Sequence, residues 1–155
     1  MAARNDETPL GRVRSISVGD FMTRELVTVN ESDDLALAEN MLRLGGIRHL
    51  PVVREGRLVG LVTHRDLLRS AMSRDRRSTT AGDIMTRDLE SVRPDTSLVR
   101  AARLMLEKKF GCLPVTEGTG RLVGIITESD FVRFAADVVQ DLDLVAEAAT
   151  AHERV

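Results

Sequence analysis

Two stretches of nearly the same sequence decide the fold: GRLVGLVTHRD at residues 56–66 and GRLVGIITESD at residues 120–130. Each is an apolar run set between glycines, followed by Thr, two variable polar residues and Asp. The length, the branched side chains and the glycines predict a buried strand. A Thr followed three residues later by an acid is typical of a helix start. Each stretch therefore predicts a strand that leads directly into a helix.

The duplication extends outward from these stretches toward the N-terminus. VGDFMTRELVTV at residues 18–29 is repeated as AGDIMTRDLESV at residues 81–92, about 63 residues later. HLPVV at residues 49–53 is repeated as CLPVT at residues 112–116 at the same spacing. The chain therefore contains a tandem duplication within one domain's length of sequence.

Both copies predict the same order of elements. A short extended segment ends at residues 28–29 or 91–92, and apolar residues at helical spacing then predict a helix over 35–44 or 98–107. Two strands and the closing helix follow. Neither copy is large enough to bury a good core alone. The predicted fold class is α/β (α+β), with two tandem β-α-β-β-α repeats packed as a pseudo-twofold pair.

The ends of the chain complete the predicted organisation. Apolar residues recur at three- and four-residue spacing after the second Thr-x-x-Asp motif, which predicts a long C-terminal helix over about residues 129–150. This helix either packs back on its own module or forms an interface for dimerisation or a partner. We expect an N-terminal arm at 1–15, repeats at 16–73 and 81–136, a linker at 74–80 and a helix extension at 137–155.

The composition of the chain excludes several classes of function. A net charge of −2 and a pI of about 5.9 give no general attraction to nucleic acid. Three His and one Cys form no cluster at metal-ligand spacing. The first residues carry charges instead of an apolar run, and no apolar stretch approaches the roughly 18 residues of a membrane span. We therefore expect a cytoplasmic protein with no nucleic-acid, membrane or metal partner.

The repeated Thr-x-x-Asp motif allows two interpretations. It is a helix-capping signature, but Glu or Gln is the usual third residue of a capping box. Capping also does not require the preceding Gly60 or Gly124, which would let a ligand approach the backbone closely. A helix N-terminus after a strand is a phosphate site, and an Asp suits a ribose diol. The second interpretation is therefore a duplicated nucleotide site.

Together, the opening D-x-M-T-R, the central LPV, the GRLVG hairpin and the closing motif resemble a tandem CBS domain pair, or Bateman module, over about residues 18–135. The resemblance implies clefts between the repeats that bind AMP, ADP, ATP or S-adenosylmethionine, with no covalent cofactor. It also implies homodimers of such pairs and an effector protein. For a first site it implies Thr28, Val29, Arg48, His49, Leu50, Thr63, Arg65 and Asp66. For a second site it implies Ser91, Val92, Gly111, Cys112, Leu113, Thr127 and Asp130.

The two copies differ in charge, and this difference predicts unequal sites. The first copy has Arg48, His49, His64, Arg65 and Arg69 near its motif. The second has Gly111, Cys112, Glu128 and Ser129 at matching positions, with Arg133 retained, although groups of one repeat can reach the other's cleft. Arg favours phosphate binding through charge-assisted bonds.

The predicted function is a regulatory module that binds adenosine-containing ligands and signals by a change of conformation or assembly. The alternative is a ligand-free protein–protein interaction scaffold with degenerate clefts. No catalytic motif occurs in the sequence, so we expect no enzyme activity.

Overall fold

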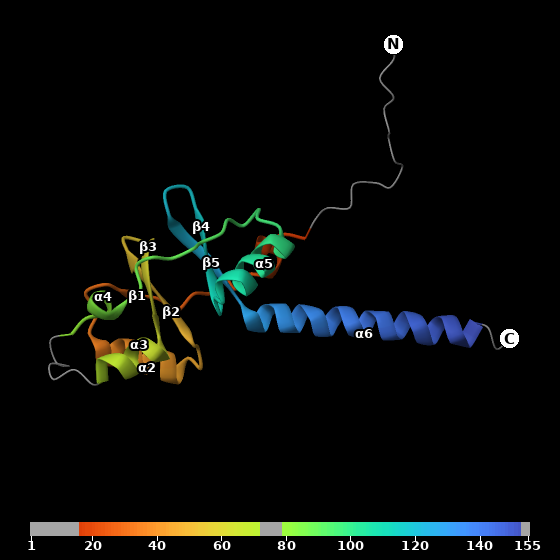
Figure 1. Ribbon diagram of the computed structural model, residues 1–155, viewed down its shortest axis with the longest axis horizontal. Helices are drawn as coiled ribbons and strands as arrows, with labels where there is room; N and C mark the ends of the chain where they lie inside the picture. The colour runs from red at the N-terminus through yellow and green to blue at the C-terminus, as the bar shows by residue number, and fades with distance from the viewer. Residues whose placement is uncertain (1–15, 72–78, 153–155) are drawn as a thin grey trace, which may run out of the picture.

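The computed structural model describes residues 16–71 and 79–152. The predicted N-terminal arm and residues 74–78 of the predicted linker lie outside these described residues. Within them the chain forms two halves of similar design, each built around an antiparallel hairpin (Figure 1).

The order of elements is almost the same in both halves. The first half contains α1 (Val18–Phe21), β1 (Val29–Asn30), α2 (Leu35–Leu44), β2 (His49–Arg54), β3 (Arg57–Thr63) and α3 (His64–Ala71). The second contains α4 (Ala81–Ile84), α5 (Leu98–Lys108), β4 (Cys112–Glu117), β5 (Arg121–Thr127) and α6 (Glu128–His152). The extended segment predicted to end at residues 91–92 is present as a single parallel bridge between Val92 and Val115.

The described strands form one five-stranded sheet in the order β1-β2-β3-β5-β4. The two hairpins, β2–β3 and β4–β5, are antiparallel and meet through the pair Arg57 and Arg121. Both hairpin turns require the left-handed region: Gly56 has φ 74° and Gly120 has φ 98°. The predicted α/β architecture with a long C-terminal helix is confirmed.

Each hydrophobic core is completed by the opening segment of the other half. The first core, around Leu50 and Val62, includes Ala81 and Met85 of the second half. The second core contains Val18 and Met22 of the first half. Two backbone crossings fix this exchange: Thr86 pairs with Leu61 of β3, and Thr23 pairs with Ile125 of β5. Neither half has a complete core of its own, which explains the pseudo-twofold pairing.

The exchange also explains the glycine inside each second strand. A Cβ built on Gly60 would overlap the side chain of Met85, and one on Gly124 would lie 2.5 Å from the sulfur of Met22. The prediction that these glycines admit a ligand is therefore wrong. Their bare backbone instead accommodates a methionine from the opposite half.

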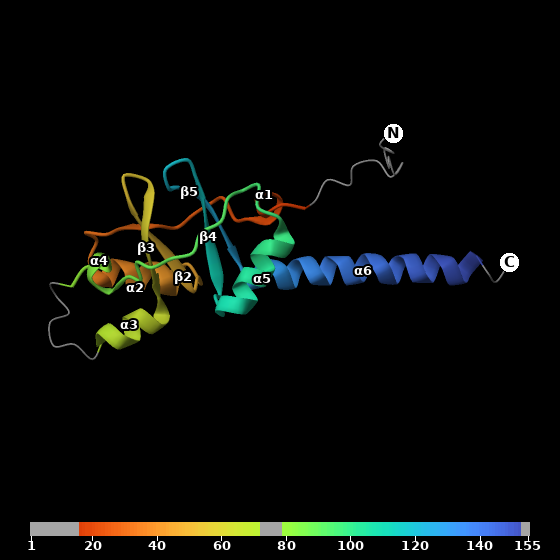
Figure 2. The ribbon, with the colours of Figure 1, turned by 45° about the horizontal axis from the view of Figure 1, so that its top comes forward.

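The long helix α6 leaves the body of the protein after its first turns (Figures 1 and 2). Phe131 and Phe134 pack against the second core, and the ring of Phe134 lies 4.9 Å from that of Phe21. Every side chain described from Ala135 to Leu144 is exposed. The interpretation that the extension packs back on its own module is therefore wrong for this part of α6.

Candidate functional site: a cleft between the two halves

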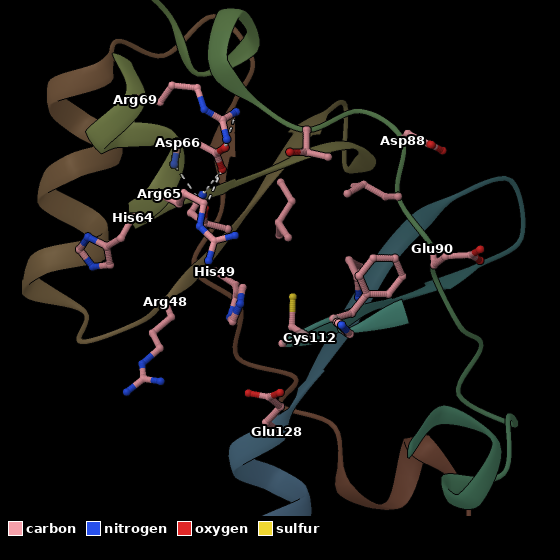
Figure 3. Close-up of a pocket in the computed structure, with 18 residues that line it drawn as sticks. Arg48, His49, His64, Arg65, Asp66, Arg69, Asp88, Glu90, Cys112 and Glu128 are labelled. Carbon is pink, nitrogen blue, oxygen red and sulfur yellow. Dashed lines mark hydrogen bonds and ion pairs between the residues drawn. The ribbon is translucent and has the colours of Figure 1, made fainter. Parts of the chain in front are cut away.

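A cleft of about 740 Å³ lies between the two halves (Figure 3). The first half contributes Arg48, His49, Leu61, Thr63, His64, Arg65, Asp66 and Arg69. The second contributes Thr86, Asp88, Leu89, Glu90, Lys109, Phe110, Gly111, Cys112, Pro114 and Glu128. The cleft thus combines the end of β3 and the start of α3 with the segment that follows α4 and the start of β4.

The crossing of Thr86 over β3 places one wall of the cleft. The backbone N–H of Thr86 donates to the carbonyl of Leu61 at 2.9 Å, and the N–H of Leu61 donates back at 3.0 Å. After this pair the chain continues along the side of the cleft opposite α3. Asp88, Leu89 and Glu90 therefore line the cleft across from the first half's closing motif, although they belong to the second repeat. The carboxylates of Asp88 and Glu90 point away from that motif (Figure 3).

In both halves the Asp of the closing motif caps the start of the helix through its side chain, and in the first half the N–H of Asp66 also donates to the Thr63 hydroxyl at 3.4 Å. The backbone N–H and the hydroxyl of Thr63 donate to Oδ2 of Asp66 at 2.8 and 2.7 Å. Thr127 donates to Asp130 in the same way at 2.8 and 2.9 Å. The helix-capping interpretation of the motif is confirmed. Because Oδ2 of each Asp is engaged in the cap, only Oδ1 has remaining capacity to accept bonds from a ligand.

The second carboxylate oxygen differs between the halves. Oδ1 of Asp66 lies 4.0 Å from Nη1 of Arg69, beyond hydrogen-bond distance. Oδ1 of Asp130 accepts a hydrogen bond from Nη1 of Arg133 at 3.2 Å. Both Asp side chains are buried, at 7% exposure. Oδ1 of Asp66 therefore keeps its capacity to accept a hydrogen bond beside the cleft, whereas Oδ1 of Asp130 already accepts one from Arg133.

The arginines of the cleft all lie on one side, while Asp66 of the first half and Lys109 of the second half add charges of the other sign to each side. Arg48, Arg65 and Arg69 lie on the side formed by the first half, while Asp88 and Glu90 lie on the opposite side (Figure 3). Between these sides the lining includes the apolar residues Leu61, Leu89, Phe110 and Pro114. The arrangement suits a ligand that is anionic at one end, flat or apolar in the middle, and able to donate hydrogen bonds at the other end.

Two titratable groups occupy matching positions where the halves meet. Burial lowers the pKa of His49, Glu128 opposes this effect, and Arg48 adds to it. Burial raises the pKa of the Cys112 thiol to about 12, with a further contribution from Glu128. Gly111 allows the close approach, since a Cβ there would lie 3.0 Å from Nε2 of His49. His49 is therefore neutral near pH 7, and the thiol stays protonated.

The cleft brings together residues from both predicted sites. Of the first set, Arg48, His49, Thr63, Arg65 and Asp66 line it. Of the second set, Gly111 and Cys112 line this same cleft, so the two sets are not spatially separate.

The remaining predicted residues lie elsewhere. Val29 and Leu50 are in the first core, and Val92 and Leu113 are in the second. Thr28 is half-buried immediately before β1. The hydroxyl of Ser91 accepts a hydrogen bond from that of Thr116 at 3.3 Å, and Thr127 and Asp130 cap α6. None of these residues lines the cleft described above.

Sequence reasoning missed the wall contributed by the second repeat. The missed lining residues are Leu61, Thr86, Asp88, Leu89, Glu90, Phe110 and Pro114. A signal for this wall was available, because M-T-R-x-L occurs at the start of both copies. Its repetition indicates a shared role, but the role depends on a crossing that no local pattern reveals.

The described residues contain neither a group of metal ligands nor a helix that could cross a membrane. Among them, no three His, Cys, Asp or Glu side chains are grouped so that they could hold a metal ion. No helix in the described part of the chain combines the length and apolar character that crossing a membrane requires.

Comparison with known proteins identifies the family. The model of the CBS domain matches residues 18–73 and 81–137. The protein AcuB of Vibrio cholerae is 37% identical, with a TM-score of 0.76, over 83% of this chain and 96% of that one. CBSX2 of Arabidopsis thaliana, solved in complex with AMP, is 37% identical, with a TM-score of 0.71, over 79% of this chain and 98% of that one.

A third structure contains other adenosine ligands. The CBS domain pair of MJ0100, in complex with 5′-methylthioadenosine and S-adenosyl-L-methionine, is 27% identical, with a TM-score of 0.72, over 79% of this chain and 98% of that one. The chain spans only 22% to 47% of three curated relatives to which it is 32% to 36% identical. With both copies matched over most of its length, the chain belongs to the CBS domain family, as a tandem CBS pair.

Proposed function

We propose that this chain is a regulatory module that binds an adenosine-containing ligand in the cleft between its halves. The observation that carries the proposal is the lining, with three arginines on the side of the first half and apolar residues beside them. The side of the second half carries Asp88 and Glu90 together with Lys109. The AMP complex of a protein 37% identical to this chain supports it. The complex of MJ0100 with S-adenosylmethionine and 5′-methylthioadenosine supports the same class of ligand.

The charges favour a nucleotide whose phosphates lie toward the first half. Arg48 and Arg65 would bind the phosphates through charge-assisted bonds, together with the N-terminus of α3. Asp66 would accept from the ribose through Oδ1, because Oδ2 serves the cap. The base would lie against Leu89 and Phe110. On this basis AMP, ADP or ATP is favoured over S-adenosylmethionine, whose sulfonium would be repelled by the arginines.

A second, weaker site would use Thr127 and Asp130, with Thr28 and Val29 crossing from the other half. Two features weaken it: Arg133 already occupies Oδ1 of Asp130, and Glu128 lies beside the motif.

We propose no catalytic activity for the chain, because the two neighbours it covers to 96% and 98% are CBS proteins of similar extent.

Signalling requires that the ligand prefer one arrangement of the two halves or of two copies. The cleft lies between halves that complete each other's cores, so a ligand that contacts both halves can bias their relative position. The receiver of the signal would be an effector protein, reached through a homodimer of CBS pairs.

Ligand-dependent thermal stability tests the proposal. We would measure unfolding midpoints with AMP, ADP, ATP, S-adenosylmethionine and NADH, using wild type and the variants Asp66→Asn and Asp130→Asn. A ligand at 100 times its Kd stabilises the fold by about 2.7 kcal/mol, a shift of several degrees. We expect the shift to be lost in Asp66→Asn and retained in Asp130→Asn.

Asp130→Asn is a matched control because both Asp residues make the same cap, so loss of capping affects the two variants alike. The companion variant Arg65→Gln leaves the cap intact and should weaken ATP more than AMP. No shift with any adenosine compound at millimolar concentration would overturn the proposal. The ligand-free scaffold would then be the better interpretation, with the Thr-x-x-Asp motifs acting as caps only.

A further inference from the structure

The part of α6 from residue 135 to residue 152 is here called the tail, and its described side chains, up to Leu144, carry an unpartnered apolar row. Val138, Val139 and Leu142 are 40%, 56% and 63% exposed. By helical spacing they continue the row that Phe131 and Phe134 begin against the second core. A helix of 25 residues is about 37 Å long, so most of the row projects beyond the core (Figures 1 and 2).

The tail is also acidic along its whole length. Asp137, Asp141, Asp143 and Glu147 lie in it, and the sequence has no Lys or Arg between residues 134 and 152. Most of the stability of a helix in a protein comes from packing of its apolar face, so a covering surface would stabilise the tail. Two tails packed side by side would bring like charges together without any base between them. The surface that covers the tail is therefore expected to be apolar and basic.

The second half offers such a surface. A groove of about 730 Å³ runs beside α5, with Arg93, Arg100 and Arg103 together with the apolar Val99 and Leu104 in its lining. Arg93 already faces Asp95 at 3.5 Å. Among the described residues, neither Arg100 nor Arg103 forms an ion pair. Glu90 and Glu107 also line the groove, but neither forms an ion pair with Arg100 or Arg103. The guanidinium groups of these two arginines can therefore bind an acidic partner.

The basic groove is a property of this sequence and not a requirement of the fold. The positions in the first half that match Arg93, Arg100 and Arg103 are Asn30, Leu37 and Asn40. The helices α2 and α5 form equally well with either set. The arginines of the groove and the acidic tail are therefore both features of the second copy's sequence.

We propose that the tail of one copy docks in the α5 groove of a second copy. Its apolar row would pack against Val99 and Leu104, and Asp141 and Asp143 would pair with Arg100 and Arg103. The tail leads away from its own body (Figure 2), which favours a groove on another molecule. Because each copy carries one tail and one groove, two copies can exchange tails and close a twofold dimer.

Charge reversal in the full-length chain tests this exchange. We would measure association by sedimentation over about 1 to 200 µM for wild type, for the groove variant Arg100→Glu/Arg103→Glu and for the tail variant Asp141→Lys/Asp143→Lys. Wild type should dimerise, and each variant alone should have a dimer Kd raised at least about tenfold. Raised salt should weaken the wild-type dimer as well.

Mixing the two variants distinguishes direct pairing from a general loss of stability. In an equimolar mixture each tail meets a groove of opposite charge, so dimers should return. The variant Arg43→Glu, an exposed change on α2, is the matched control and should dimerise like wild type, and circular dichroism checks the folding of all variants. The proposal is overturned if wild type is monomeric, if the variant dimers are as tight as wild type, or if the mixture fails to associate.

Discussion

The two halves place different side chains at the same points of one backbone. His49 pairs with Thr63 across the first hairpin, and Cys112 pairs with Thr127 across the second. The capping bonds of the two closing motifs agree within 0.2 Å. Yet the first motif borders a cleft with three arginines, and the second gives its free oxygen to Arg133. The apolar pattern and the caps fix the backbone, while the residues between them determine the chemistry.

The reactivity of Cys112 should show the largest effect. A pKa of about 12, against about 8.5 for a free thiol, reduces the thiolate fraction at pH 8 by about three orders of magnitude. Alkylation by iodoacetamide, followed by mass spectrometry, should therefore be at least about a hundredfold slower in native than in urea-unfolded protein. As the comparison, His49→Cys in a Cys112→Ala background places a thiol beside Arg48. This thiol should react faster than Cys112 does, and equal rates would contradict the assigned difference between the halves.

The exchange of methionines predicts a matched pair of destabilised variants. Gly60→Ala would overpack against Met85, and Gly124→Ala against Met22, each at a cost of about 1 to 3 kcal/mol in unfolding free energy. The two losses should be of similar size, because the added Cβ at residue 60 would lie 3.0 Å from the Cβ of Met85, and the one at residue 124 would lie 3.2 Å from the carbonyl oxygen of Thr23. Urea unfolding followed by circular dichroism measures both.

The double variant Gly60→Ala/Met85→Ala provides the control for this mechanism. If the added methyl group and the Met85 side chain compete for one space, the two losses should be clearly less than additive. Additive losses would show that the glycine is needed for another reason, such as its backbone conformation.

The sequence predicted the elements better than their assembly. Apolar periodicity and the repeated motifs were sufficient for α2, α5 and both hairpins, because these depend on local residues. The second wall of the cleft was missed because Asp88 and Glu90 reach it only through the crossing of Thr86 over β3. Gly60 and Gly124 were assigned to ligand approach because a sequence shows where a side chain is missing but not what fills the space. The sequence left open whether the tail packs on its own module or forms an interface, because an apolar row does not specify its own partner.

The two caps should differ by a smaller amount in stability. Asp66→Ala and Asp130→Ala each remove a capping side chain, at a cost of about 0.5 to 2 kcal/mol. Asp130→Ala also removes the hydrogen bond to Arg133, but that arginine side chain is 70% exposed, so the added loss is only a few tenths of a kcal/mol. Urea titrations of both variants measure the difference. A clearly larger loss in Asp66→Ala would contradict the idea that the first motif is the less occupied of the two.

The smallest effect concerns pH and His49. Burial holds the pKa of His49 in the folded state below 6.5, so as the pH falls through 6.5 the unfolded chain binds protons that the folded chain does not. The folded state therefore loses stability on acidification below about pH 6.5, and this group contributes no pH dependence above it.

His49→Gln should reduce the change of the thermal unfolding midpoint between pH 7 and pH 5. Glu128→Gln removes the charge that partly supports the protonated form, so it should steepen the fall. Cys112→Ser changes the matching position of the other half and should leave the slope unaltered, because its thiol does not titrate in this range. If Glu128→Gln flattens the slope instead, the assignment of the pH dependence to His49 would be wrong.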